Sequence, residues 1–144
     1  MLDPALKGKT SQPSVYEMSR EKVREYAQAI GDTNPIYYDV AAARAQGHPD
    51  LLLPPTGASI FALRPIADLL LAQSTNVNVA RLVHGEQEYE FVAPVYAGDT
   101  LTTVARIADV YSRGNLDFLI FETTSQNQHG QTVVTGRANM IIRG

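Results

Sequence analysis

The side chains best suited to chemistry lie in one short segment, residues 31–39, which reads Gly-Asp-Thr-Asn-Pro-Ile-Tyr-Tyr-Asp. Asp32 can accept or release a proton, and Asn34 offers a hydrogen-bond donor and an acceptor two residues later. Pro35 fixes its own φ and disfavours helical geometry at Asn34. An acid and an amide on a rigid turn can orient a water molecule, although Asp, Asn, Gly and Pro are also ordinary turn formers.

A helix over residues 19–30 is expected to position this segment. One side of this helix is apolar, because positions i, i+3, i+4 and i+7 are occupied by Val23, Tyr26, Ala27 and Ile30. Ser19 is suited to the N-cap position, and Gly31 to a left-handed cap at the other end. Asp32 is therefore expected to leave the helix at a fixed point.

The rest of the chain predicts further helices followed by long strands. A short alanine-rich helix is expected over residues 40–46. A longer apolar helix is expected from about 58 to 73, with protein on nearly all its sides and a kink or break at Pro65. From residue 81 the apolar period changes to two, which predicts strands over 86–91, 99–111, 116–126 and 131–142.

Tight turns that contain glycine join the long strands, so we expect an antiparallel meander. The apolar helix is the element available to cover the apolar face of this sheet. The predicted fold class is therefore α+β, with a curved antiparallel sheet wrapped around one buried helix, in a single domain over residues 1–144.

Composition excludes several classes of function. The formal net charge is −3 and no Lys/Arg run occurs, which argues against nucleic-acid and membrane partners. The chain has no cysteine, and its three histidines are not paired at helical spacing, so no zinc site and no resident cofactor are expected. The N-terminus does not read as a secretory signal, and no apolar stretch could span a bilayer, so a cytoplasmic location is expected.

Five segments, 24–27, 31–37, 53–56, 83–91 and 94–101, together resemble the MaoC-like family of (R)-specific enoyl-CoA hydratases and 3-hydroxyacyl dehydratases. The chain looks most like the N-terminal-type domain of that family, which resembles a fatty-acid-synthase dehydratase. The resemblance implies a hot-dog fold. It also implies reversible hydration of a trans-2-enoyl thioester, of coenzyme A or acyl carrier protein, to the (R)-3-hydroxyacyl thioester.

The family's catalytic pattern is G-D-x-N-P-x-H, in which the Asp and the His activate one water molecule. By position, the resemblance assigns the acid to Asp32 and the orienting amide to Asn34. A backbone N–H at the start of the buried helix stabilises the thioester oxygen, and we expect Gly57 to supply it. The expected substrate-binding residues are Pro55, Thr56, Gly57 and Gln87.

Tyr37 occupies the position of the family histidine. With a reference pKa of about 10, tyrosine is a poor base near neutral pH, but it can donate a hydrogen bond. His84, His48 or a partner's histidine can then supply the missing imidazole, whereas His129 is expected to be a solvated turn residue. The expected catalytic residues are Asp32, Asn34, Tyr37 and His84.

Three functions follow from these residues. The first is a hydratase/dehydratase that works on its own. The second is a non-catalytic acyl-binding subunit of a heterodimeric dehydratase whose partner supplies the histidine. A hot-dog thioesterase is the third, against which the Asp-x-Asn-Pro motif argues. Because the sheet has exposed edges and the family buries its acyl tunnel between two hot-dogs, we expect a homodimer, or a heterodimer with a His-bearing homologue.

Overall fold

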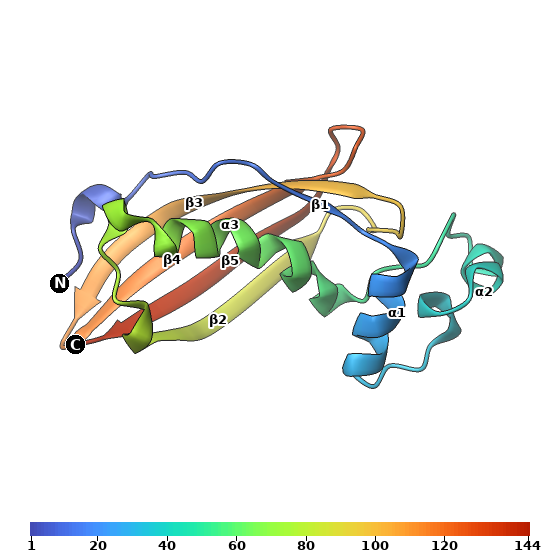
Figure 1. The fold of residues 1–144 in the computed structure, drawn as a ribbon, viewed down its shortest axis with the longest axis horizontal. Helices are drawn as coiled ribbons and strands as arrows, with labels where there is room; N and C mark the ends of the chain where they lie inside the picture. The colour runs from blue at the N-terminus through green and yellow to red at the C-terminus, as the bar shows by residue number, and fades with distance from the viewer.

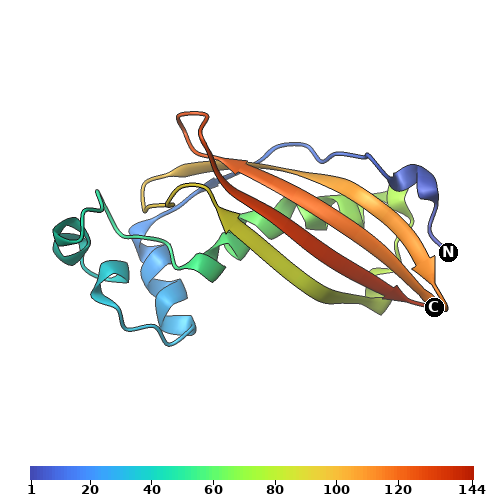
Figure 2. The same cartoon turned by 180° about the vertical axis from the view of Figure 1, so that it is seen from behind.

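The computed structural model describes all 144 residues, and one antiparallel sheet forms its body. The strands are β1 Ser14–Glu17, β2 Leu82–Phe91, β3 Thr100–Arg113, β4 Leu116–Gln126 and β5 Thr132–Arg143. The helices are α1 Arg20–Ala29, α2 Val40–Ala45 and α3 Ser59–Leu71. The strand order is β1-β3-β4-β5-β2, and α3 lies along one face of the curved sheet (Figures 1 and 2). The predicted α+β class is confirmed.

The connection between strands differs from the predicted meander. Only β3, β4 and β5 follow one another as hairpins, whereas β2, which precedes them in the chain, pairs with β5 at the far edge. The short strand β1 was not predicted from sequence, because four residues carry too little alternation to recognise. It pairs with β3 from Ser14 opposite Thr103 to Glu17 opposite Thr100.

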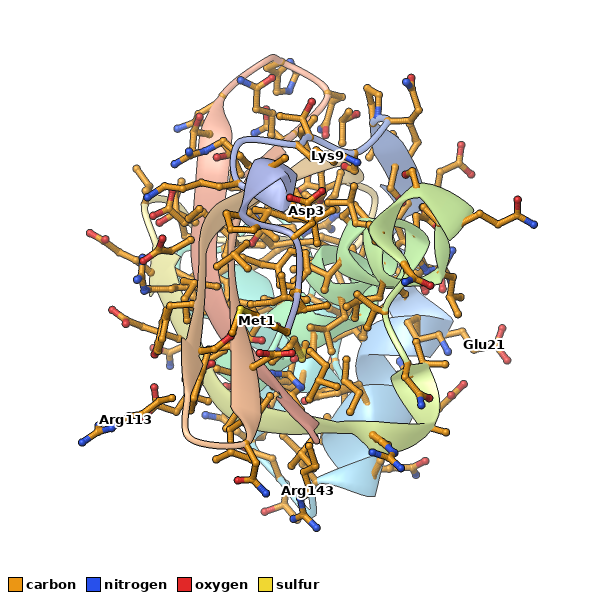
Figure 3. The ribbon with its side chains drawn as sticks, turned by 90° about the vertical axis from the view of Figure 1, so that its left-hand side faces the viewer. Met1, Asp3, Lys9, Glu21, Arg113 and Arg143 are labelled. Atoms are coloured by element: carbon orange, nitrogen blue, oxygen red, sulfur yellow. The ribbon has the colours of Figure 1, made fainter.

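Large apolar side chains fill the space between the sheet and α3. Phe121 of β4, Ile107 of β3 and Phe61 of α3 are each at most 1% exposed. A view along the molecule shows side chains crowding this space, while the labelled Arg113 and Arg143 extend away from the end of the sheet (Figure 3). The core is therefore a sandwich of one sheet face and one helix.

Helix α3 is one continuous helix with Pro65 inside it, so a break at Pro65 is wrong, and the kink stays a prediction. The expectation of protein on nearly all sides of α3 is also wrong for the single chain. Ile66, Leu69 and Leu70 pack in one core cluster with side chains of the sheet, whereas Arg64, Asp68 and Leu71 are exposed. None of the helices is long and apolar enough to cross a membrane.

Residues 19–50, called the overhang below, carry α1 and α2 beyond one end of the sheet (Figure 1). The Ser19 hydroxyl accepts a hydrogen bond from the Lys22 N–H at 3.0 Å, which confirms the predicted N-cap of α1. Gly31 has a φ of +72°, as the predicted left-handed cap requires. The chain therefore leaves α1 in a fixed direction toward Asp32.

Candidate active site

Backbone contacts on both sides hold Asp32 in place. Its N–H donates to the Ala27 carbonyl at 3.0 Å, and the Tyr38 hydroxyl donates to its carbonyl oxygen. In its carboxylate, Oδ1 accepts the Asn34 N–H at 2.9 Å, whereas Oδ2 has no partner and no cation pairs with the group. The loop is fixed, and one carboxylate oxygen is available to a water molecule.

Asn34 is first of all a turn residue. Its side-chain Oδ1 accepts the Ile36 N–H at 3.2 Å and so caps the short 3₁₀ turn Pro35–Tyr37. Only the NH₂ of the amide is left for a ligand. Asn34 and His48 line the same surface hollow, so the structure brings these two candidates together.

Tyr37 points into the protein and is 8% exposed, in the same core cluster as Ala27 and Leu51. Burial raises the pKa of Tyr37, and the negative charge of the neighbouring Asp32 raises this pKa further. The phenol therefore stays protonated near neutral pH. It can donate a hydrogen bond but cannot accept a proton from water.

The 3₁₀ turn Pro55–Ala58 leads directly into α3, and here the structure differs from the prediction for Gly57. The Gly57 N–H already donates to the Pro54 carbonyl at 2.8 Å, so it is not available to a thioester oxygen. A Cβ at this position would lie 2.7 Å from Leu53 Cδ1, so glycine is required here for packing. Pro54 and Pro55 have no N–H, which makes Thr56 the first residue of this turn that can donate. No backbone or side-chain acceptor of the chain faces the Thr56 N–H.

Two hydroxyl pairs beside this turn were not predicted from sequence. The Tyr26 hydroxyl donates to Thr56 Oγ1 at 2.8 Å, and Ser59 Oγ lies 2.8 Å from the Tyr89 hydroxyl. Burial raises the pKa of Tyr89, so this phenol also stays neutral. Tyr26 fits the apolar stripe of its helix, and no spacing rule relates it to a residue thirty positions away.

An apolar groove borders the same helix start. Its walls come from Leu52, Leu53 and Pro55 and from residues 91–95, where β2 ends and the following turn begins. Pro55, which forms part of the wall, directly precedes Thr56. A hydrocarbon chain in this groove would have its polar end near the Thr56 N–H.

A bulge in β2 orients the second group of candidates. His84 pairs with Met140 and Glu86 with Asn139, so Gly85 is the extra residue. The bulge places His84 and Gln87 on one face of β2, the face that carries the buried Met140. His84 Nε2 lies 3.0 Å from Gln87 Oε1.

The amide of Gln87 fixes the tautomer of neutral His84. Gln87 Nε2 donates to the backbone carbonyls of Glu88 and Arg137, each at 3.3 Å, so Oε1 is the amide atom that faces the imidazole. A carbonyl oxygen can only accept, and His84 Nε2 must therefore carry the proton. Nδ1 is left with a free lone pair on an exposed ring.

The structure does not bring any of the three histidines to Asp32. His84 lies near the start of β2, whereas Tyr89, near the other end of that strand, is the residue that contacts the start of α3. His48 Nδ1 lies 3.0 Å from the Tyr96 hydroxyl, and His129 is exposed in the turn after β4. No group of three or more His, Asp or Glu side chains could hold a metal ion.

Comparisons with known proteins agree with this geometry. A family model described as "FAS1-like, dehydratase domain region" matches residues 5–136. A protein from Streptomyces griseus named UPF0336 protein is 37% identical over 143 residues, which cover 99% of this chain and 95% of that protein.

Among solved structures, a chain of the HadBC (3R-hydroxyacyl-ACP dehydratase) complex from Mycobacterium tuberculosis superposes with a TM-score of 0.85 and 26% identity. The match covers 94% of this chain and 96% of that one. The R-hydratase PhaJ1 from Pseudomonas aeruginosa superposes with a TM-score of 0.73 at 20% identity, over 95% of this chain and 81% of that one, which is a likeness of fold alone. The curved sheet over α3 is thus the hot-dog fold of MaoC-like dehydratases.

Proposed function

The chain belongs to the FAS1-like dehydratase domain family, and from this premise we propose that it is the acyl-binding subunit of an acyl-thioester hydratase/dehydratase. In the proposed reaction, water adds across a trans-2-enoyl thioester, hydroxyl to C3 and proton to C2, to give the (R)-3-hydroxyacyl thioester. A second hot-dog chain supplies the histidine that activates this water. The thioester is carried by coenzyme A or by acyl carrier protein.

The observation that carries the proposal is Tyr37. A buried phenol with a raised pKa stands where the family has its imidazole, and no histidine of the chain contacts Asp32. Acid–base catalysis of hydration needs a group that exchanges protons near the working pH. His48 lines the same hollow as Asn34 but is held by the Tyr96 hydroxyl and does not contact Asp32, so the imidazole is assigned to a partner. That HadBC is named as a complex is consistent with such an arrangement.

In this proposal the chain's own residues bind and polarise the substrate. The apolar groove beside Pro55 accommodates the acyl chain. The Thr56 N–H, with the partial positive charge of a helix start, donates to the thioester oxygen as the enolate develops. Thr56 Oγ1 is held by Tyr26, which fixes the first turn in position for this contact.

One observation favours a second candidate, a hydratase that needs no other gene product. Asp32 Oδ2 is free, and His84 has an oriented ring with an open Nδ1. A homodimer could bring His84 of one copy toward Asp32 of the other. The same assay separates the two candidates.

The assay follows loss of the enoyl-thioester absorbance of crotonyl-CoA and of longer enoyl-CoA esters. We expect no hydration by the purified chain and hydration once a His-bearing hot-dog chain is added. Hydration by the chain alone that disappears in Asp32→Asn, but not in the exposed control Asp68→Asn, would replace the proposal with the self-sufficient enzyme. Release of free thiol from acyl-CoA would instead indicate a thioesterase.

A further inference from the structure

The outer face of the sheet, turned away from α3, carries an ordered pattern of side chains at the end where β2 begins (Figure 2). Strand pairing brings residues of β3, β4, β5 and β2 into rows that cross the sheet. The last row holds three arginines and a leucine: Arg113, Leu116, Arg143 and, directly before β2, Arg81. The next row is apolar throughout: Tyr111, Phe118, Ile141 and Val83. The third row has an acid at each end: Asp109, Ile120, Asn139 and Glu86.

These three rows, called the end patch below, point away from the core. Their neighbours along the strands, Leu119 and Met140 among them, are buried in the cluster that includes Ile66 of α3. Because successive side chains of a strand alternate between faces, the rows of the end patch lie on the other side of the sheet.

The arginine row and the apolar row are open to solvent. Arg81, Arg113 and Arg143 are exposed, and none of them forms an ion pair. In the apolar row, Val83 is 38% exposed and Tyr111 is 43% exposed. An exposed apolar band with polar residues beside it is typical of a surface that binds another molecule.

The acceptors of the third row are not fully used. Glu86 is exposed and forms no ion pair. Asp109 accepts a hydrogen bond from Lys7 Nζ at 3.0 Å through Oδ1 alone, so its Oδ2 is free. Asn139 Oδ1 is the one buried side-chain nitrogen or oxygen atom of the chain without a hydrogen-bond partner. Buried polar atoms of native proteins nearly always have a partner, so Asn139 requires a donor from outside the chain.

The end patch is complementary to itself under a two-fold rotation. When two copies stack outer face to outer face about an axis along the apolar row, each strand lies antiparallel over the same strand of the other copy. The apolar row then meets itself, and the arginine row of each copy meets the third row of the other. The result is an arginine against an acceptor on three strands and two apolar side chains on the fourth: Arg113 with Asp109, Arg81 with Glu86, Arg143 with Asn139, and Leu116 with Ile120. Each pair occurs twice, as an isologous interface requires.

We infer that the end patch binds the end patch of a second copy of this chain, so that two sheets stack back to back. The overhang lies at the opposite end of the sheet (Figure 1), so the two copies extend in opposite directions and their candidate active sites stay open. This contact uses a face of the sheet and leaves its edges free. It therefore adds to any pairing with a hot-dog partner, and it does not depend on the proposed function.

The charges of the end patch favour a second copy over an anionic lipid surface or an acidic protein. Either of these would be attracted by the arginines but repelled by Glu86 and Asp109 in the same patch. Strands lie about 4.8 Å apart and successive outward residues about 6.8 Å apart, so the patch and its side chains cover roughly 20 Å by 20 Å. Such a contact buries on the order of 1,000 Å² in total, near the lower limit for a specific interface. We therefore expect a dissociation constant in the micromolar range.

Sedimentation equilibrium tests this contact. The wild type should double in mass between about 10 and 200 µM. Arg81→Glu and Glu86→Arg should each weaken the doubling at least about tenfold, because two symmetric pairs become repulsive. The double variant restores opposite charges and should associate within about threefold of the wild type. Arg64→Glu, the same change on an exposed residue of α3, is the control and should associate like the wild type.

A single cysteine reports the contact directly, because the chain has none of its own. Val83 belongs to the row on the two-fold axis, so a short bis-maleimide should join two copies of Val83→Cys across sheets about 10 Å apart. Thr124→Cys, exposed on the outer face of β4 but outside the end patch, should not be joined. Adding Arg81→Glu to Val83→Cys should lower the yield. Far-UV circular dichroism confirms that each variant is folded.

Three results would overturn the inference. One is a wild type with the same mass as Arg81→Glu at every concentration. Another is a double variant that associates no more tightly than either single variant. The third is an undoubled wild type that sediments with vesicles of phosphatidylglycerol when Arg81→Glu does not, which would assign the end patch to a lipid surface. All of these readouts measure association and not hydration, so their failure would leave the proposed function untouched.

Discussion

The body of the molecule and the overhang are held together in different ways. In the body, large side chains such as Phe61 and Phe121 are fully buried between the sheet and α3. In the overhang, α1 buries only Val23 and Ala27, and α2 only Ala43. The hydrophobic effect, which has no direction, therefore dominates in the body and contributes less in the overhang.

Directional polar contacts position the overhang instead. Arg20 forms a two-pronged ion pair with Asp50, with Nη2 to Oδ2 at 2.8 Å, and Arg24 Nε donates to the Tyr38 carbonyl at 3.0 Å. Tyr26 ties α1 to the start of α3. The comparison teaches that fold and site geometry are separable here. Changes in the body should unfold the protein, whereas changes in these contacts should move Asp32 and leave the fold intact.

The largest expected effect comes from the body. Phe121→Ala should lower the free energy of unfolding by about 3–5 kcal/mol, because it leaves a cavity under α3. Denaturant unfolding followed by circular dichroism measures this loss. Phe118→Ala, on the half-buried side of the same strand where the ring stacks on Tyr111, should cost clearly less. Equal losses would mean that the helix-side core is not the dominant source of stability.

A change at the junction of the two regions should have an intermediate effect. Gly57→Ala should cost about 1–3 kcal/mol, because its Cβ collides with the buried Leu53 side chain. Leu53→Ala also destabilises, because Leu53 is buried, but the loss in the double variant should be smaller than the sum of the two single losses, since the two changes act on one contact. Purely additive losses in thermal or chemical unfolding would contradict this account of why glycine stands there.

Within the overhang, Tyr26→Phe should cost about 1 kcal/mol by removing the hydrogen bond to Thr56. Amide hydrogen exchange should rise in α1 and at the start of α3, with little change in β3–β5. Tyr16→Phe is the matched control, because this half-buried tyrosine donates no hydrogen bond from its hydroxyl. Faster exchange throughout the sheet would show that the overhang and the body unfold as one unit.

The smallest effect concerns pH. The hydrogen bond from Arg20 lowers the pKa of Asp50, so the pair stabilises the folded state fully above the ordinary pKa of an aspartate, about 4. This stabilisation is lost as pH falls through the lowered value. Asp50→Asn should therefore speed amide exchange in α1 at pH 6, and the difference from wild type should disappear at strongly acidic pH. A difference that persists at all pH values would point to packing.

Sequence alone predicted the long regular elements well. Strand β4 was predicted at its observed bounds, and β3 and β5 to within two residues, because long alternation is a strong signal. The caps at Ser19 and Gly31 were also predictable, since each depends only on local geometry. The pairing of β2 with β5 was not predictable, because alternating apolar and polar residues indicate that a segment is a strand but not which strand it pairs with.

The candidate site was only partly predictable for the same reason. Asp32 and Asn34 are only two residues apart, so their proximity was predictable, and in the structure the Asn34 N–H donates to the Asp32 carboxylate. The donor at the helix start was assigned to Gly57, but the local turn uses that N–H and leaves Thr56. The contacts of Tyr26 and Tyr89 depend on tertiary packing, which no local pattern encodes. The catalytic and binding roles of these residues stay predictions.

The bulge at Gly85 sets the face of the sheet on which the first residues of β2 lie. Successive side chains of a regular strand alternate between faces, so Leu82 and His84 would share the face of Glu86 if Gly85 were paired in the ladder. Because Gly85 is left out of the pairing, they lie on the helix side instead. A Cβ there would meet Ile141 at 2.8 Å, so no larger residue fits without movement. For protein engineering, deletion of Gly85 should therefore remove the bulge and leave His84 opposite Met140 on the helix side, so the strand can be shortened here without moving the imidazole to the other face.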